Sequence, residues 1–173
     1  SHDYAHCWRC QNQILYRTTT QWFFKIEDLI PKMRKLNKEK MYWVPDWAGN
    51  KQFDSWLENL RDNGITRQRF WGSPLPVWKC DSCKDYVVVE SRKELKKLGA
   101  SHIPEDLHKP WIDEVTLPCK KCKGTMRRNP DIMDVWIDAG VDSWASLGYP
   151  HDEELFKKLF PADFITEGKD QIR

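Results

Sequence analysis

The chain has 173 residues, of which 40% are hydrophobic and 31% are charged, and its formal net charge at pH 7 is only +2. These values are ordinary for a globular protein, and the charge is too small to predict nucleic-acid binding by itself. No apolar run approaches the roughly 18 residues of a membrane span, and no signal peptide is recognisable. We therefore expect a cytoplasmic, monomeric protein without a membrane partner.

Three C-x-x-C pairs occur in the chain, and the first, Cys7 and Cys10, stands almost at the N-terminus. A four-thiolate metal site uses two such pairs, so one of the three is left without a partner. We expect Cys7 and Cys10 to be half of a second metal site that is completed outside this chain. The sequence is therefore expected to be a piece of a longer protein.

Residues 15–26 are rich in β-branched and aromatic side chains and predict a strand. Residues 28–40 carry apolar side chains at helical spacing among lysines, which predicts an amphipathic helix. A second helix is predicted near residues 51–62, with Gly64 as its C-cap. Residues 1–63 would thus form a connective region with two helices.

Residues 65–78 form a polar, non-periodic stretch that is closed by one glycine and two prolines. Two arginines, Arg67 and Arg69, stand here beside two aromatic residues, Phe70 and Trp71. Such a loop is either a binding element or a support for a neighbouring one, and its composition does not favour either.

Two further pairs, Cys80 with Cys83 and Cys119 with Cys122, predict the main metal site. Each pair can present two thiolates from one tight turn, and two such turns complete the tetrahedral sulfur set that Zn²⁺ prefers. The alternatives are two disulfides or four free thiols. Zinc is favoured because a Lys/Glu-rich chain without a secretion signal is typical of reducing compartments, where disulfides are rare.

The interval between these two pairs is long enough to hold an inserted subdomain. A short strand is predicted at residues 86–90, and a helix with a serine cap and a terminating glycine at residues 91–98. Residues 111–117 alternate and predict a strand, to which residues 125–128 would return as a partner. Residues 64–128 would then be a zinc-binding subdomain that depends on its metal more than on a large core.

Residues 129–140 place acidic and amide side chains around an apolar centre. Residues 141–147 and 152–160 predict two short helices. Residues 162–173 predict a buried strand that turns sharply at a glutamate–glycine pair. Polar groups just past the carboxyl end of a strand are where open α/β sheets hold ligands.

Six segments of distinctive composition follow one another along the chain. They are residues 7–10 (CWRC), 18–23 (TTTQWF), 66–74 (TRQRFWGSP), 130–136 (PDIMDVW), 143–147 (SWASL) and 160–171 (FPADFITEGKDQ). Together they resemble the isoleucyl-tRNA synthetases, a family of class I aminoacyl-tRNA synthetases. The valyl enzymes share the overall plan and are the alternative within the class, but D-V-W at residues 134–136 and T-E-G at residues 166–168 are similar to the isoleucyl version.

This resemblance implies an α+β fold. In that family a Rossmann catalytic domain is interrupted by a connective insertion that contains an editing domain. The chain resembles the internal part after the editing domain: a small mixed zinc-binding connective subdomain with helices, leading into the first strand of the second Rossmann half. Residues 129–173 would be the truncated return to the catalytic core. The partner of Cys7 and Cys10 would lie upstream of the editing domain.

The resemblance also implies roles for individual residues. Those implied to line the aminoacyl-adenylate site are Glu167, Gly168, Asp170 and Gln171. Trp136 would form a wall of the isoleucine pocket. Those implied to support the catalytic floor, or to approach the acceptor end of the tRNA, are Arg67, Gln68, Arg69 and Trp71. The alternatives are a solvated turn for the first set and a core tryptophan for Trp136.

The complete enzyme would join isoleucine to ATP, used with Mg²⁺, and pass the acyl group to tRNA(Ile). The family's two ATP signature motifs, His-Ile-Gly-His and Lys-Met-Ser-Lys-Ser, are absent from this chain, which we expect to be inactive alone. Two other interpretations remain open. One is a zinc-ribbon module that binds RNA through the basic residues 120–128, with a salt-dependent affinity. The other is a structural module without catalysis.

Overall fold

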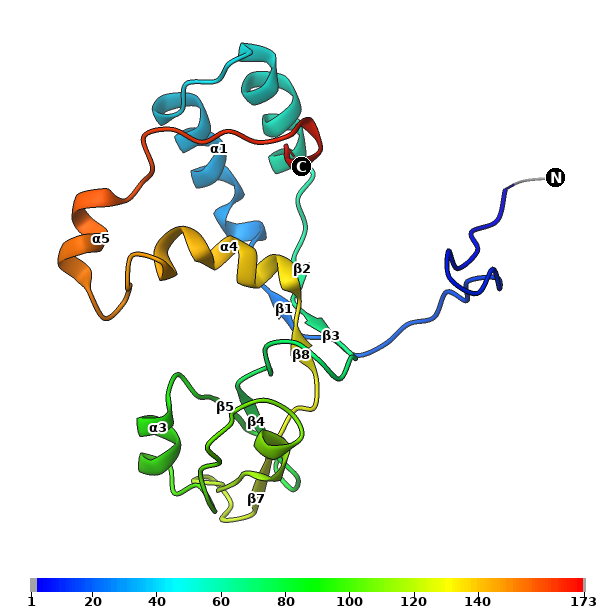
Figure 1. Cartoon of the computed structure of the whole chain (residues 1–173), viewed down its shortest axis with the longest axis vertical. Helices are drawn as coiled ribbons and strands as arrows, with labels where there is room; N and C mark the ends of the chain where they lie inside the picture. Colours follow the sequence, from blue (N-terminus) through cyan, green and yellow to red (C-terminus); the bar gives the residue numbers. More distant parts are fainter. Residues whose placement is uncertain (1–2, 173) are drawn as a thin grey trace.

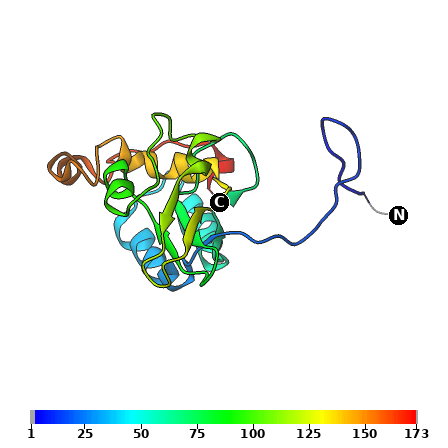
Figure 2. The same ribbon diagram turned by 90° about the horizontal axis from the view of Figure 1, so that it is seen from below.

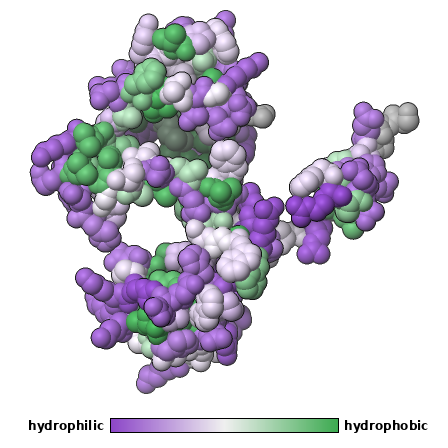
Figure 3. All heavy atoms as spheres, viewed as in Figure 1, coloured by the Kyte–Doolittle hydropathy of each residue, from purple (hydrophilic) through white to green (hydrophobic). Residues whose placement is uncertain are grey.

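The structure of the chain, a computed structural model, describes residues 3–172. Two lobes are joined by a neck, and an N-terminal tail projects away from both (Figures 1 and 2). The lower lobe comprises residues 77–128, and the upper lobe comprises residues 27–62 and 134–172. The neck comprises the two segments between them, residues 63–76 and 129–133. Figure 3 shows open space between the lobes beside the neck.

Two pairs of short helical elements open the upper lobe. They are η1 (Glu27–Leu29), α1 (Ile30–Lys40), η2 (Ala48–Phe53) and α2 (Asp54–Glu58). The first pair confirms the helix predicted for residues 28–40. The second begins earlier and ends sooner than the single helix predicted for residues 51–62, and Leu57 is its fully buried anchor at 2% exposure.

Asp54, the first residue of α2, fastens the two helices together. Its carboxylate accepts hydrogen bonds from Arg34 of α1, at 3.0 Å from Nε and 2.7 Å from Nη2. Only 8% of Asp54 is exposed. The hydrogen bonds from Arg34 lower the pKa of Asp54 by more than its desolvation raises it, and Lys38 adds to the lowering.

The pairing of α1 with α2 is therefore expected to depend on pH in the acid range. Because the folded pKa of Asp54 lies below the unfolded value of about 3.9, the stabilisation is fully present above that value. It is lost as the pH falls through the depressed folded pKa. Amide chemical shifts of α1 and α2, followed from pH 6 to pH 2, should show this loss. An Asp54→Asn variant should lack it, and identical acid profiles for the two proteins would contradict the assignment.

The strand predicted for residues 15–26 is wrong for most of its length. Only β1 (Phe23–Phe24) forms, paired antiparallel with β2 (Asn63–Gly64). A strand needs a partner for its backbone groups, and none of the described strands runs beside residues 15–22. Leu15 and Tyr16 are accordingly 85% and 80% exposed.

Gly64 is likewise not a helix cap, because it pairs with Phe23 across this two-residue ladder. A Cβ at Gly64 would come within 2.7 Å of the Gln21 side chain. Gly64 therefore lies in a strand pair beside the Gln21 side chain and not at a helix end.

The lower lobe is built on a four-stranded antiparallel sheet with the order β5-β4-β7-β6. Its elements are β4 (Val77–Cys80), β5 (Tyr86–Val88), α3 (Arg92–Lys97), η3 (Trp111–Glu114), β6 (Thr116–Pro118) and β7 (Thr125–Arg128). The strand near residues 86–90, the helix at residues 91–98 and the return strand at residues 125–128 are confirmed. Trp78, Val115 and Leu117 are central in its core.

The strand predicted for residues 111–117 is wrong in its first half, where η3 forms. Ile112 and Val115 are both buried, at 4% and 0% exposure. A spacing of three residues brings both side chains to one face of a 3₁₀ turn. The same pair of apolar residues was thus compatible with a helical turn, and only residues 116–118 form the strand.

The second half of the upper lobe follows a short neck strand, β8 (Ile132–Met133), which pairs with β3 (Thr66–Arg67). It contains α4 (Val135–Ala145), α5 (Glu153–Leu159) and η4 (Lys169–Gln171). The helix predicted at residues 141–147 begins six residues earlier, because Asp134 caps it through the Trp136 N–H at 2.8 Å. The helix predicted at residues 152–160 is confirmed, with Asp152 as its cap.

The buried strand predicted for residues 162–173 is not formed within the described part, which extends to residue 172. Phe164 and Ile165 are 82% and 67% exposed. A parallel strand of a Rossmann domain is stabilised by neighbours on both sides, and residues 3–172 offer this segment none. The entry into a Rossmann domain is therefore not seen here. None of the helices in residues 3–172 has the length and hydropathy needed to cross a bilayer.

Candidate metal centre and the neck beside it

The sheet of the lower lobe brings two cysteine turns to one end. Cys80 ends β4 and opens the turn into β5, whereas Cys119 and Cys122 lie in the turn between β6 and β7. β4 and β7 are neighbours in antiparallel register, with Cys80 opposite Met126. The end of β4 therefore lies beside the start of β7, and the two turns face each other.

The four sulfur atoms of Cys80, Cys83, Cys119 and Cys122 all lie within 4.8 Å of one another. Two of these contacts join different turns, at 3.5 Å for Cys80 with Cys122 and 3.6 Å for Cys83 with Cys119. Four sulfurs at the usual Zn–S length of about 2.3 Å would be about 3.8 Å apart at the corners of a tetrahedron. A disulfide needs about 2.0 Å. The cluster thus fits a four-thiolate metal site and does not form disulfides.

The same backbone arrangement shapes all three C-x-x-C turns, so we call each of them a knuckle. In each knuckle the first cysteine donates its N–H to the carbonyl five residues later. It also accepts at its own carbonyl from the N–H four residues later. The bonds are Cys7–Asn12 and Gln11–Cys7 (both 2.8 Å), Cys80–Asp85 and Lys84–Cys80 (2.7 and 3.2 Å), and Cys119–Gly124 and Lys123–Cys119 (2.8 and 2.9 Å). The fourth position after each first cysteine has a positive φ of 61°, 64° and 60°.

In the first two knuckles, backbone N–H groups are directed at the sulfur of the first cysteine. The N–H of Cys83 is the main cause that lowers the pKa of Cys80 to about 6. At Cys83 the N–H of Asp85 acts in the same direction, but burial and the neighbouring cysteine sulfurs together raise its pKa to about 12. Four thiolates cannot ionise together at this distance without a cation, which is the charge that a bound dication would supply.

The first knuckle has the backbone of a metal half-site but no second half in the described chain. The N–H of Cys10 is the main cause that lowers the pKa of Cys7, in the same way as at Cys80. Among residues 3–172, only the set around Cys80 gathers three or more side chains that could hold a metal ion. Cys7 and Cys10 therefore stay a pair on the projecting tail (Figure 1).

A turn of the neck next to the lower lobe collects two of the predicted floor residues. Gln68 donates from Nε2 to Asp131 at 3.0 Å, and Arg67 forms an ion pair with Asp134. Both carboxylates are buried, at 8% and 6% residue exposure. Arg67 and Gln68 therefore support the Asp131–Asp134 turn directly. The sequence showed acidic residues here, but it carried no signal for their partners more than 60 positions away.

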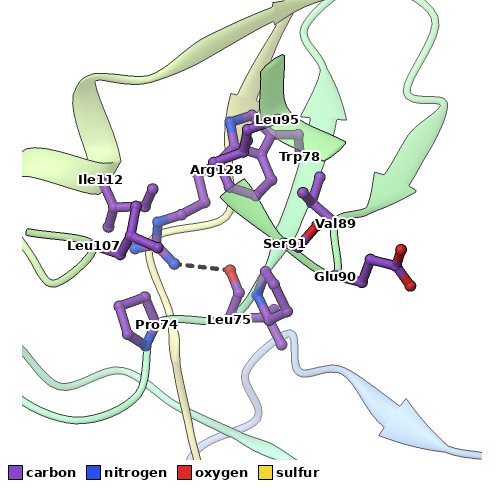
Figure 4. A pocket seen from close by; sticks show the side chains of 11 residues that line it. Pro74, Leu75, Trp78, Val89, Glu90, Ser91, Leu95, Leu107, Ile112 and Arg128 are labelled. Atoms are coloured by element: carbon purple, nitrogen blue, oxygen red, sulfur yellow. Dashed lines mark hydrogen bonds between the residues drawn. The ribbon is translucent and has the colours of Figure 1, made fainter. Parts of the chain in front are cut away.

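The other predicted binding residues remain accessible. Trp71 and Trp136 are 70% and 66% exposed, and Arg69 is exposed as well. The predicted adenylate-site residues lie in the exposed C-terminal segment, where Gly168 precedes η4. All four residues of that set are exposed, namely Glu167, Gly168, Asp170 and Gln171. A cavity of about 190 Å³ between the neck and the lower lobe is lined by Pro74, Trp78 and Arg128 among others, and by none of these predicted binding residues (Figure 4).

The basic residues 120–128 do not form one uniform cationic face. The side chain of Arg128 is completely buried, and Arg127 pairs with Asp81 at 3.1 Å. Lys121 lies 4.0 Å from Asp85. The structure thus reduces the basis for an RNA-binding ribbon at this segment.

Comparisons with known proteins match the whole chain. The family profile described as tRNA synthetases class I (I, L, M and V) covers residues 8–173. The isoleucine–tRNA ligase of Methanopyrus kandleri is 48% identical over 99% of this chain, and that of Methanocorpusculum labreanum is 49% identical over 100% of this chain. These matches cover 17% and 16% of the two relatives, so the chain spans about a sixth of their length.

A solved structure, an Agrobacterium radiobacter K84 LeuRS in a ternary complex with tRNA and LeuAMS, shares 30% identity with a TM-score of 0.33. It covers 56% of this chain and 13% of that one. A TM-score this low supports no conclusion about the arrangement of the lobes. The family profile, by contrast, extends over nearly every residue and includes both the cysteine cluster and the Asp131–Asp134 turn. The chain therefore belongs to the class I tRNA synthetases.

Proposed function

We propose that the chain is the zinc-binding connective segment of an isoleucine–tRNA ligase, together with the start of its return to the catalytic domain. The observation that carries this proposal is the identity of 48–49%, across the entire chain, to proteins of that name. The complete enzyme would activate isoleucine with ATP and Mg²⁺ and transfer it to tRNA(Ile). Because the relatives reported above are isoleucine–tRNA ligases, they favour the isoleucyl assignment over the valyl alternative.

The metal of this segment would be Zn²⁺ in a structural role. Cys80, Cys83, Cys119 and Cys122 would occupy all four positions of a tetrahedral site, and a closed site leaves no position for a substrate. Cys7 and Cys10 would hold a second metal with ligands from outside the chain. Their knuckle backbone, equal to that of the other two, supports this proposal.

The exposed aromatic and polar residues of the upper lobe would be contacts of the complete enzyme. Trp136 at the start of α4 would form a wall of the isoleucine pocket, and residues 164–166 would join the parallel sheet of a Rossmann domain. Glu167 and Gly168 would then reach the adenylate, with Asp170 and Gln171 beside them. Arg67 and Gln68 would hold the pocket turn, whereas Arg69 and Trp71 are free to approach the tRNA.

An exchange assay tests the proposal. Isoleucine-dependent exchange of pyrophosphate into ATP should be absent for this chain alone and present for the complete protein. In the complete protein, Trp136→Ala should lower kcat/KM for isoleucine by about 10–200-fold, as expected for losing part of an apolar pocket wall. Trp111→Ala, a similarly exposed tryptophan of the lower lobe, should change it little. Activity with valine but not isoleucine, or equal effects of both substitutions, would contradict the assignment.

A further inference from the structure

The two chain segments that form the neck between the lobes are held by three side chains of the lower lobe. Within the neck, residues 69–75 lead into the lower lobe and residues 129–133 lead out of it. We refer to these three side chains together as the clasp; they are Lys109, Asp113 and Arg128.

Arg128, the last residue of β7, joins both neck segments. Its guanidinium donates from Nη1 to the carbonyls of Leu75 and Asp131, at 3.0 Å each. It also donates from Nε to Asp113 at 2.7 Å. The side chain is 0% exposed, so these bonds are shielded from water. Figure 4 shows the bond to Leu75 at the edge of the cavity between neck and lobe.

Lys109 also joins both neck segments, through carbonyls other than those that Arg128 reaches. Its ammonium donates to the carbonyl of Pro130 at 2.8 Å and, at 3.4 Å, to that of Arg69. It lies 5.3 Å from the centre of the Phe70 ring and 3.9 Å from Asp113. Only 11% of its side chain is exposed. One lysine thus contacts both the ingoing and the outgoing segment.

Asp113 lies between the two cations and balances their charge. Buried cations are costly without a paired carboxylate, and removing one partner leaves the other uncompensated. Lys109 and Asp113 come from the segment between the second and third knuckles, whereas the carbonyls that accept from Lys109 and Arg128 belong to the neck. These four carbonyls are those of Arg69, Leu75, Pro130 and Asp131.

We propose that the clasp is a positioning device that fixes the orientation of the lower lobe relative to the Asp131–Asp134 turn. The outgoing carbonyls of the clasp belong to Pro130 and Asp131, and the Asp131 carboxylate accepts from Gln68. A ring contact between Trp22 and Tyr86 of β5, at 5.2 Å between centroids, also joins the lower lobe to the rest of the chain. Releasing the clasp bonds is expected to let the lobe rotate about this contact. The consequence for catalysis, through Gln68 and Trp136, rests on the proposed function; the orientation itself does not.

Residual dipolar couplings of backbone amides in the zinc-loaded chain test the proposal. In the unsubstituted chain, couplings from the β4–β7 sheet and from α1 and α2 should fit a single alignment tensor. In Lys109→Met the two sets of couplings should need two different tensors. Losing the charge-assisted hydrogen bonds should shift the ratio of molecules with the clasp formed to molecules with it released by about tenfold or more. Lys109→Arg, which can still reach both carbonyls, should restore the single tensor.

The matched control is Lys97→Met, an exposed lysine of α3 in the same lobe, which should leave the single tensor unchanged. Asp113→Asn should separate the tensors as Lys109→Met does, with Glu114→Gln as its exposed neighbouring control. A single tensor in both Lys109→Met and Asp113→Asn would overturn the proposal. Unfolding of the lower lobe in Lys109→Met would also overturn it, because the lysine would then maintain the fold rather than the orientation. Neither result depends on the identity of the complete enzyme.

Discussion

Replacing Cys119 by serine should abolish tight zinc binding and unfold the lower lobe, while α1 and α2 stay folded. A core of this size is insufficient alone, because domains below about 70–80 residues usually need a metal or disulfides. Structural zinc supplies roughly 10–16 kcal/mol of apparent binding free energy, and in such systems that energy is folding free energy. Two-dimensional amide spectra should lose the dispersed signals of β4 to β7 and keep those of the upper lobe.

The matched control for this variant is Cys10→Ser, which removes an exposed thiol from the knuckle on the tail. It should leave the lower-lobe signals and their zinc dependence unchanged. Persistence of the β4–β7 signals in Cys119→Ser would show that the sheet is stable without its metal. The cysteine cluster would then not be the anchor of this lobe.

Asp134→Ala should destabilise the junction of the neck and α4 by about 1.5–3 kcal/mol. The loss combines a helix cap, worth about 0.5–2 kcal/mol, with the ion pair to Arg67, which contributes about 1 kcal/mol at a partly exposed site. Arg67 is 43% exposed at its side chain, so it can regain hydration when its partner is removed. Urea titration of the zinc-loaded chain, followed through α4 amides, measures the change.

Asp134→Asn separates the two contributions. Asparagine caps a helix about as well as aspartate, so only the ion pair is lost, and about 1 kcal/mol of destabilisation is expected. Equal losses in the alanine and asparagine variants would show that the cap at Trp136 contributes little. Arg67→Ala should cost more than Asp134→Asn, because it leaves the buried Asp134 carboxylate without its cationic partner.

Features encoded in short stretches of sequence could be predicted. The helix of residues 28–40 follows from its apolar spacing, and α3 from its ends. Ser91 accepts from the N–H of Glu94 at 3.2 Å, and Gly99 has the positive φ of 82° that ends a helix. The metal site could be predicted for the same reason, because each C-x-x-C spacing already favours the knuckle geometry.

Features that depend on distant partners could not be predicted. Strand composition at residues 15–22 and 162–166 is clear in the sequence, but a strand forms only where another strand lies alongside it. The clasp depends on the register of β6 with β7 and on the path of a long insertion, so no local pattern shows that Asp113 meets Arg128. The sequence singled out Arg67 and Gln68 as supports of the catalytic floor or as contacts of the tRNA, but it could not show that Asp131 and Asp134 would be their buried partners.

The most direct test of the proposed four-cysteine zinc site is the X-ray absorption spectrum of zinc in the chain, with the metal content measured alongside. A variant with Cys7 and Cys10 both changed to serine isolates the lower-lobe site. We expect one zinc ion per chain in this variant, surrounded by four sulfur atoms at about 2.3 Å. A zinc shell with nitrogen or oxygen ligands in place of sulfur, or a folded lower lobe without zinc, would contradict it.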